Sequence, residues 1–220
     1  MRRAVTRLRS AMLVSAMLVL PILALGLCAA LPAMAAAENG WTSVQKLVAI
    51  VSQWKGAKAD PSVNRQAAQY IDYQSMGQRA LGSDQWNKLN AGQQHQFVST
   101  LQTLMEQRYY PRWHRIFSKA KLNHVSDAAS GSDTLVKTDM VLGKKTDSLV
   151  WRVTGKGNEA KIVSLAIGDN DLLTKLKGRL QEKLAKSNFS SLLAWMQSKA
   201  KQQSAATAEV SSADVIGESK

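Results

Sequence analysis

The side chains that most often carry out catalysis are few in this chain, and they are not spaced for it. The three histidines are His95, His114 and His124, and no two of them have the His-x-x-x-His spacing by which one helix face holds a metal. The chain also lacks the Gly-x-Ser-x-Gly turn of serine hydrolases and a glycine-rich phosphate loop. We therefore expect surface or boundary histidines, no catalytic residues, and no metal or cofactor.

The acidic residues fit structural roles better than chemical ones. Asp169-Asn170-Asp171 resembles the opening of a calcium loop, but the glycine and glutamate that such a loop needs downstream are missing. This tripeptide therefore predicts a turn followed by a helix cap. Asp72 and Asp84 are likewise expected to cap helices.

The apolar residues of this sequence, and its methionines in particular, indicate more about function than its polar residues do. Met76 and Met105 lie in segments with helical periodicity, and Met140 lies in a segment of alternating polarity. Methionine is a flexible side chain that fills irregular apolar space. The same residues would build either a solid core or a cavity for acyl chains, since a lipid tail needs only apolar walls. The sequence pattern does not separate these two possibilities.

The elements that position these side chains fall into three blocks. Helical periodicity predicts a helix over residues 41–55, shorter helices between 64 and 86, and a long helix over 91–119 that Pro111 must kink or break. Four apolar or alternating segments follow, separated by glycine-containing turns, and they predict three successive hairpins. These predicted strands are residues 122–125, 134–142, 149–153 and 162–167.

A third block of helical spacing, with Leu172, Leu176 and Leu180 on one face, closes the periodic part of the chain. This order predicts an α+β fold. We expect an antiparallel meander of four or more strands, with N- and C-terminal helices packed on one face and enclosing a solid core or an apolar cavity.

The N-terminus has the pattern of a secretory signal peptide. Four arginines precede an apolar run from residue 11 to 31, and Ala33-Met34-Ala35 is a small-x-small cleavage site. Ala35-Ala36-Ala37 is an alternative site, and a retained membrane anchor is the alternative reading of the apolar run. We predict a signal peptide over residues 1–35, a single domain over 38–201 and a disordered tail over 202–220.

Cleavage would also decide the cysteine content and the charge of the mature protein. Cys28 follows Leu27 rather than a small residue, which argues against lipid attachment, and it would leave with the signal peptide. The net charge is +13, and loss of the four arginines leaves +9 (13 − 4 = 9). Because nucleic acid is scarce outside the cytoplasm, we expect an anionic membrane surface or an acidic protein as the counterpart, or merely a soluble basic surface.

Several segments share their order and spacing with a known family. Residues 70–82 read Tyr-Ile-Asp-Tyr-Gln-Ser-Met-Gly-Gln-Arg-Ala-Leu-Gly, and Trp86 follows. Gln93 and Phe97 have a Gln-x-x-x-Phe spacing, and residues 136–138 read Val-Lys-Thr. Over roughly residues 41–200 the chain resembles the MlaC-type, or toluene-tolerance, phospholipid-binding proteins. Residues 160–165 differ from the Trp-x-Val-x-Asp-Val strand of that family.

This resemblance implies a periplasmic lipid carrier, the soluble component of an ABC-type system that moves phospholipids between the outer and inner membranes. The implied partners are a phospholipid, an inner-membrane ABC transporter complex and an outer-membrane lipoprotein complex, with no nucleic acid, and we expect a monomer. The acyl chains would lie between sheet and helices with the headgroup near solvent. The expected lipid-binding residues are Met76, Val98, Leu101, Met105, Tyr109, Val136, Met140, Trp151 and Ile162, with Tyr109 either at the rim or in plain packing.

Three alternatives stay open at this point. The first is a carrier of another envelope lipid, such as a hopanoid. The second is an envelope interaction protein with a solid core and no ligand. The third is an enzyme, which would require histidine or acidic groups inside the cavity.

Overall fold

The computed structural model describes residues 31–54 and 60–201, with side chains from residue 40 onward. Most of the predicted signal peptide and the predicted tail over 202–220 lie outside these ranges. The first helix, α1 (Leu31–Ser52), includes both predicted cleavage sites, so a cleaved chain would keep its later turns. Within the described residues, no helix has the length and apolar character needed to cross a bilayer.

Five antiparallel strands form one sheet, in the order β1-β2-β3-β4-β5. They are β1 (Lys121–Ser130), β2 (Asp133–Leu142), β3 (Lys145–Thr154), β4 (Lys161–Ile167) and β5 (Asn170–Asp171). The first four strands are the predicted meander, and the two-residue β5 was not predicted. Two-residue loops that begin with Gly131 (φ 63°) and Gly143 (φ 62°) join β1 to β2 and β2 to β3. Glycine adopts this positive φ without steric cost, which suits tight hairpins.

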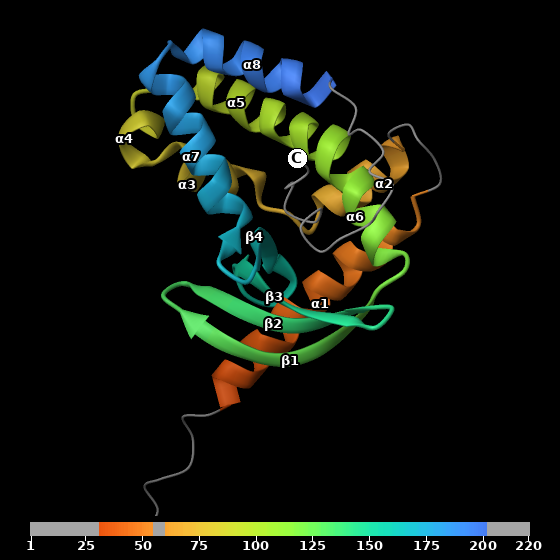
Figure 1. Ribbon diagram of the computed structural model, residues 1–220. Coiled ribbons are helices and arrows are strands. Elements are labelled where there is room, and N and C mark those ends of the chain that lie inside the picture. The colour runs from red at the N-terminus through yellow and green to blue at the C-terminus, as the bar shows by residue number, and fades with distance from the viewer. Residues whose placement is uncertain (1–30, 55–59, 202–220) are drawn as a thin grey trace, which may run out of the picture.

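Two irregularities bend the sheet. The pairing register shifts between His124 and Ser126 of β1, and again between Arg152 and Val153 of β3. An extra residue in one strand of a pair increases the local twist and bends the strand. Figure 1 shows the curved ribbon of β1 and β2 at one end of the molecule, with α1 crossing it.

The first helix lies against the face of the sheet that carries Val136. A Cβ atom at Gly40 would lie 3.0 Å from Val136 Cγ2, so glycine allows the helix backbone to approach the strand closely. Ser43 Oγ donates a hydrogen bond to the carbonyl oxygen of Ala160 at 2.7 Å, which ties α1 to the segment before β4. The buried side chains of α1 include Val44, Leu47 and Val51, which recur at helical spacing.

The predicted long helix is realised as three consecutive segments, α5 (Ala91–Leu104), η1 (Met105–Tyr109) and α6 (Tyr110–Phe117). The middle segment is a π-helix, in which the Tyr110 N–H donates to the carbonyl of Met105 five residues earlier. In a regular α-helix, Pro111 would clash with the carbonyl four residues before it and would leave that carbonyl without a donor. The wider π turn accommodates the proline without ending the helix. The predicted interruption near Pro111 is confirmed, but its π form was not predicted.

Three short helices, α2 (Pro61–Ala68), α3 (Tyr73–Leu81) and α4 (Ser83–Trp86), connect α1 to α5. The Asp72 side chain accepts a hydrogen bond from the Ser75 N–H at 2.8 Å, which confirms its predicted role as the cap of α3. The prediction that Asp84 caps a helix is wrong. Gly82 is the residue before α4, there is no side-chain cap, and Asp84 lies inside the first turn. Its negative charge still interacts favourably with the helix dipole there.

Two helices close the fold, α7 (Leu172–Ala185) and α8 (Phe189–Lys201). Asp171 caps α7 as predicted, because its carboxylate accepts a hydrogen bond from the Thr174 N–H at 2.7 Å. α8 packs along α5, where the rings of Phe97 and Phe189 lie 6.3 Å apart. α5, α7 and α8 gather at the end of the molecule away from β1 and β2 (Figure 1).

Candidate functional site

Eight of the nine residues predicted to line a lipid site belong to one buried hydrophobic cluster that joins the sheet to the helices. The ninth, Val98 of α5, is half-buried and packs against that cluster. The eight are Met76 on α3, Leu101 on α5, Met105 and Tyr109 on η1, Val136 and Met140 on β2, Trp151 on β3 and Ile162 on β4. An apolar ligand that entered between sheet and helices would therefore meet residues of this set on both sides.

The sheet side of the cluster is largely apolar, and the indole N–H of Trp151 finds its hydrogen-bond partner within the sheet. Val136 and Trp151 are paired across β2 and β3, and both side chains are fully buried. The Trp151 indole Nε1–H donates to Thr138 Oγ1 at 3.0 Å, so this polar atom has its partner within the sheet. Phe117 of α6 covers Trp151, with ring centroids 5.8 Å apart. Phe117 was not among the predicted lipid-binding residues.

The helix side of the cluster is held together by a close approach of two helices. A Cβ atom at Gly77 of α3 would lie 3.2 Å from Phe97 Cε1 of α5. Met76 and Met105 extend this side, and their side chains are 2% and 1% exposed. Methionine has three rotatable bonds and repacks more easily than a branched side chain. The methionine side chains on the helix side can therefore repack around a bound ligand more easily than the branched side chains of the core.

A buried polar pair lies inside this core. The hydroxyl groups of Tyr73 on α3 and Tyr110 on α6 share a hydrogen bond. Burial raises the pKa of both phenols, and the nearby charge of Glu106 raises it further, so both side chains stay neutral. Sequence reasoning missed this pair, because nothing in the local pattern brings Tyr73 to Tyr110.

Tyr109 is packed in the core and also lines a surface groove. Its ring packs edge-on against Trp113, with centroids 6.4 Å apart, and it belongs to the buried cluster. It also lines a surface groove of about 330 Å³, which we call the η1–α7–α8 groove. The groove is lined by Leu104, Arg108, Tyr109, Leu176, Arg179, Trp195 and Lys199. Its three cationic residues were not among the predicted site residues, since they come from separate elements and share no sequence motif.

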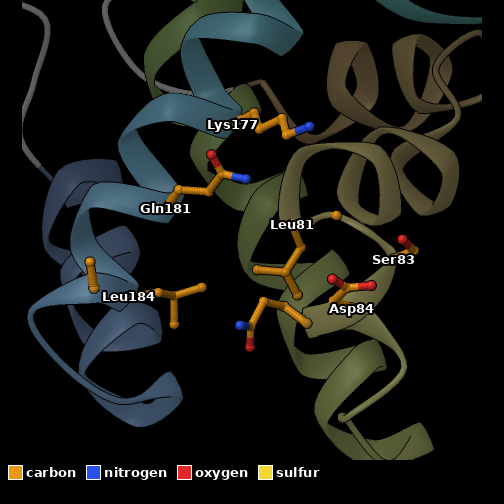
Figure 2. Close-up of a pocket in the computed structure, with 9 residues that line it drawn as sticks. Leu81, Ser83, Asp84, Lys177, Gln181 and Leu184 are labelled. Carbon is orange, nitrogen blue, oxygen red and sulfur yellow. The ribbon is translucent and has the colours of Figure 1, made fainter.

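A second groove, of about 480 Å³, lies between α7 and the α3–α4 corner. Figure 2 shows Lys177 and Gln181 of α7 on one side of it and Ser83 and Asp84 of α4 on the other. None of the predicted lipid-binding residues lines this groove. Its mixed polar lining makes it a poor site for an acyl chain.

An ion cluster fastens α3 to the sheet. Arg79 of α3 contacts the Asp133 carboxylate at 2.6 Å, and Arg152 of β3 approaches the same carboxylate at 3.3 Å. The Arg79 guanidinium holds the pKa of Asp133 below its usual value. Because each arginine already has an acidic partner, we assign this cluster a structural role.

The histidines lie at the surface or its boundary, as predicted. His95 is exposed, and the half-buried His114 places Nδ1 3.1 Å from the Val51 carbonyl oxygen, to which it can donate. His124 stacks on Trp41, with ring centroids 5.2 Å apart. Within residues 31–54 and 60–201, no group of three or more His, Cys, Asp or Glu side chains is arranged to hold a metal ion.

Comparison with known proteins connects this arrangement to a family. The family model described as MlaC protein matches residues 42–198. A search of curated proteins found no relative. Among solved structures, the chain is similar to a phospholipid-binding protein from Ralstonia solanacearum that was solved in complex with a phospholipid. The TM-score is 0.64 at 16% sequence identity, and the alignment covers 76% of this chain and 97% of that one. At this identity the likeness establishes a shared fold.

Proposed function

Because the chain belongs to the MlaC family, we propose that it is a lipid carrier that binds a phospholipid with its acyl chains between the sheet and the helices. The observation that carries this proposal is the single apolar cluster that collects eight predicted lipid-binding residues from both layers. The phospholipid found with the Ralstonia solanacearum protein of the same fold supports the choice of ligand.

Binding in this proposal needs no covalent chemistry. Each buried CH₂ group of an acyl chain contributes about 0.8 kcal/mol, so two chains supply ample affinity. Met76, Met105 and Met140 would change rotamer to make room for the chains, while the branched side chains and Trp151 keep the walls in place. Release then requires a partner that offers the chains another apolar site, because water does not.

We further propose the cellular setting that the family membership and the N-terminal pattern support. The signal peptide over residues 1–35 would direct the chain to the periplasm, where residues 38–201 form the working domain. There it would serve an ABC-type phospholipid transport system, exchanging lipid with an inner-membrane transporter complex and an outer-membrane lipoprotein complex. The cationic surface of the mature chain favours contact with anionic membranes or acidic protein surfaces.

The experiment that tests the proposal is native mass spectrometry of the mature chain purified from a bacterial periplasm, followed by identification of any extracted lipid. We expect a stoichiometric phospholipid. A hopanoid in its place would make the protein a carrier of another envelope lipid. A lipid-free mass, with no uptake from labelled liposomes, would contradict the carrier function and leave a ligand-free interaction protein.

A further inference from the structure

The buried hydroxyl pair of Tyr73 and Tyr110 has one proton more than its own hydrogen bond uses. Each phenol carries one proton, and the bond between the two oxygens takes up only one of them. Whichever hydroxyl accepts must direct its own proton elsewhere. Among residues 31–54 and 60–201, neither hydroxyl has a second hydrogen-bond partner. The side chains are 6% and 1% exposed, so the pair presents a buried donor that a ligand could use.

The pair lies where helices meet the sheet. The Asp72 N–H donates to the carbonyl of Ile162 at 3.0 Å, and the Ile162 N–H donates to the carbonyl of Tyr70 at 2.8 Å. These two bonds hold the start of α3 against β4, and Tyr73 is the first residue of α3. Tyr110 is the first residue of α6 and directly follows η1. The two hydroxyls therefore join α6 to the end of α3 that is fixed to the sheet.

Predicted lipid-binding residues share the helix faces of both tyrosines. Met76 lies three positions after Tyr73 on α3, so the two side chains are neighbours on one face of that helix. Met105 lies five positions before Tyr110, and the π-helical hydrogen bond of η1 joins these two residues. All four side chains belong to the main hydrophobic cluster. Acyl chains that displaced the two methionines would therefore pass close to the hydroxyl pair.

The surroundings of the pair favour a neutral acceptor over a charged one. Burial is the main reason that the pKa of each phenol is raised, and the negative charge of Glu106 adds to the effect. The Glu106 carboxylate is half-buried and accepts hydrogen bonds from Asn64 Nδ2 at 3.1 Å and Gln102 Nε2 at 2.7 Å. A phosphate would be repelled by this carboxylate, whereas an uncharged carbonyl oxygen would not.

A phospholipid carries such an acceptor next to its acyl chains. Its ester groups lie between the apolar chains and the charged phosphate, and each has a carbonyl oxygen that can accept but no proton to donate. A buried carbonyl without a donor costs free energy, as does a buried hydroxyl without an acceptor. Bringing the two together removes both costs. An ether-linked lipid has the same chains and headgroup but lacks the carbonyl.

We propose that the hydroxyl pair of Tyr73 and Tyr110 donates a hydrogen bond to an ester carbonyl oxygen of the bound phospholipid, and so favours ester-linked over ether-linked lipids. This inference rests on the carrier function proposed above. One hydroxyl donates to the lipid and at the same time accepts from the other, which orients it. Consecutive hydrogen bonds of this kind polarise one another, so the pair is a better donor than one phenol alone.

The test compares lipids that differ only in the linkage. The mature chain is incubated with vesicles that contain equal amounts of dipalmitoyl phosphatidylglycerol and its dihexadecyl ether analogue, and native mass spectrometry counts the bound lipids by mass. The double variant Tyr73→Phe/Tyr110→Phe removes both hydroxyls together and leaves neither without its partner, so it should fold and keep its total lipid occupancy. We expect the bound ester-to-ether ratio of the wild type to exceed that of the double variant by about three- to tenfold, as one net hydrogen bond would give.

A matched control separates the pair from tyrosine hydroxyls in general. Tyr70 is half-buried at the end of α2, and Lys46 Nζ lies 5.7 Å from the centre of its ring. Tyr70→Phe should keep the wild-type ratio, and so in part should each single variant of the pair, because one donor remains. Equal ratios in the wild type and the double variant would mean that the pair serves only to join α3 to α6, and would overturn the proposal. An equal loss in Tyr70→Phe would overturn it as well.

A second measurement observes the hydrogen bond itself. With lipid labelled by ¹³C at the ester carbonyls, the wild-type complex should show an infrared carbonyl band at lower frequency than the same lipid in a dry apolar solvent. This reading stands even if the double variant folds poorly, and the absence of a shifted band would overturn the proposal. Uptake of both lipids in the vesicle ratio by every variant would overturn the ester assignment but leave the carrier function intact. Uptake of neither lipid by the wild type would contradict the carrier function itself.

Discussion

The carrier function makes a sharp prediction for the substitution Met76→Gln. Met76 lies on α3, is 2% exposed and belongs to the main core cluster. Glutamine has nearly the same length and shape, so the change introduces an amide without a large change in volume. A buried amide without hydrogen-bond partners costs about 1–3 kcal/mol.

The chain offers a closely matched control in Met196→Gln. Met196 lies on α8, is fully buried and belongs to the same core cluster, but it is not among the predicted lipid-binding residues. Both substitutions exchange methionine for glutamine in a helix, so helix propensity and side-chain entropy change equally. Met196→Gln should lose about 1–3 kcal/mol in free energy of unfolding, measured by urea denaturation of the lipid-free protein, and Met76→Gln should lose less, because local opening lets water reach its amide.

Lipid affinity should separate the two variants. In the lipid-free protein, local opening lets water reach the amide at position 76, whereas acyl chains offer it no partner. The cost then falls on the complex, and about 1–3 kcal/mol lowers the affinity by about 5- to 150-fold, since 1.4 kcal/mol is tenfold. We expect Met196→Gln to bind a fluorescent phospholipid as the wild type does. Wild-type affinity in Met76→Gln, together with loss of binding in Met196→Gln, would refute the placement of the acyl chains.

Three further predictions concern the stability of the folded chain. Tyr73→Phe removes one hydroxyl of the buried pair, and it should cost about 1–3 kcal/mol in free energy of unfolding because the Tyr110 hydroxyl loses that partner. The double variant with Tyr110→Phe should cost less than the sum of the two single changes, and additivity in this cycle would contradict the pairing. Because the pKa of Asp133 is lowered in the folded protein, its stabilising contribution is complete above the usual carboxyl pKa and is lost as pH falls through the lowered value. Urea midpoints between about pH 5 and pH 2 should therefore fall less steeply in Asp133→Asn than in the wild type, and parallel curves would count against this. Gly155→Ala should lower the melting temperature more than Gly131→Ala, although both glycines have positive φ, because a Cβ at Gly155 would lie 2.6 Å from a backbone carbonyl oxygen while Gly131 has open space. Equal shifts in the two variants would show that the backbone moves to make room.

The α+β fold was predictable because its signals are local. The alternation of side chains along β2 and the glycines at Gly131 and Gly143 predict the first hairpins from a few neighbouring residues. The caps at Asp72 and Asp171 follow from the same kind of short-range hydrogen bond. Asp84 was misassigned because a capping residue and a first-turn residue favour the same side chains.

The membership of the core was also largely predictable, because apolar periodicity marks the face that must leave water. Met76, Leu101 and Trp151 were predicted to contact lipid from the family resemblance, and all three lie in the buried cluster. The helical spacing of apolar residues does not show how deeply each side chain is buried. Val98 has the same spacing as the buried apolar residues of α5, but it is only half-buried at the edge of the cluster. That these residues contact lipid is still a prediction.

Contacts between distant segments were decided by the tertiary structure alone. Tyr73 and Tyr110 are 37 positions apart in sequence, and neither position carries a local sign that their hydroxyl groups meet. The η1–α7–α8 groove depends on the packing of three helical segments, which places Arg108 beside Arg179 and Lys199. By itself the sequence determined which residues are apolar, which segments alternate and where the chain turns, since these depend on neighbours along the chain. The clustering of Arg108, Arg179 and Lys199 in one groove depends on how those segments pack, and only the folded chain brings them together.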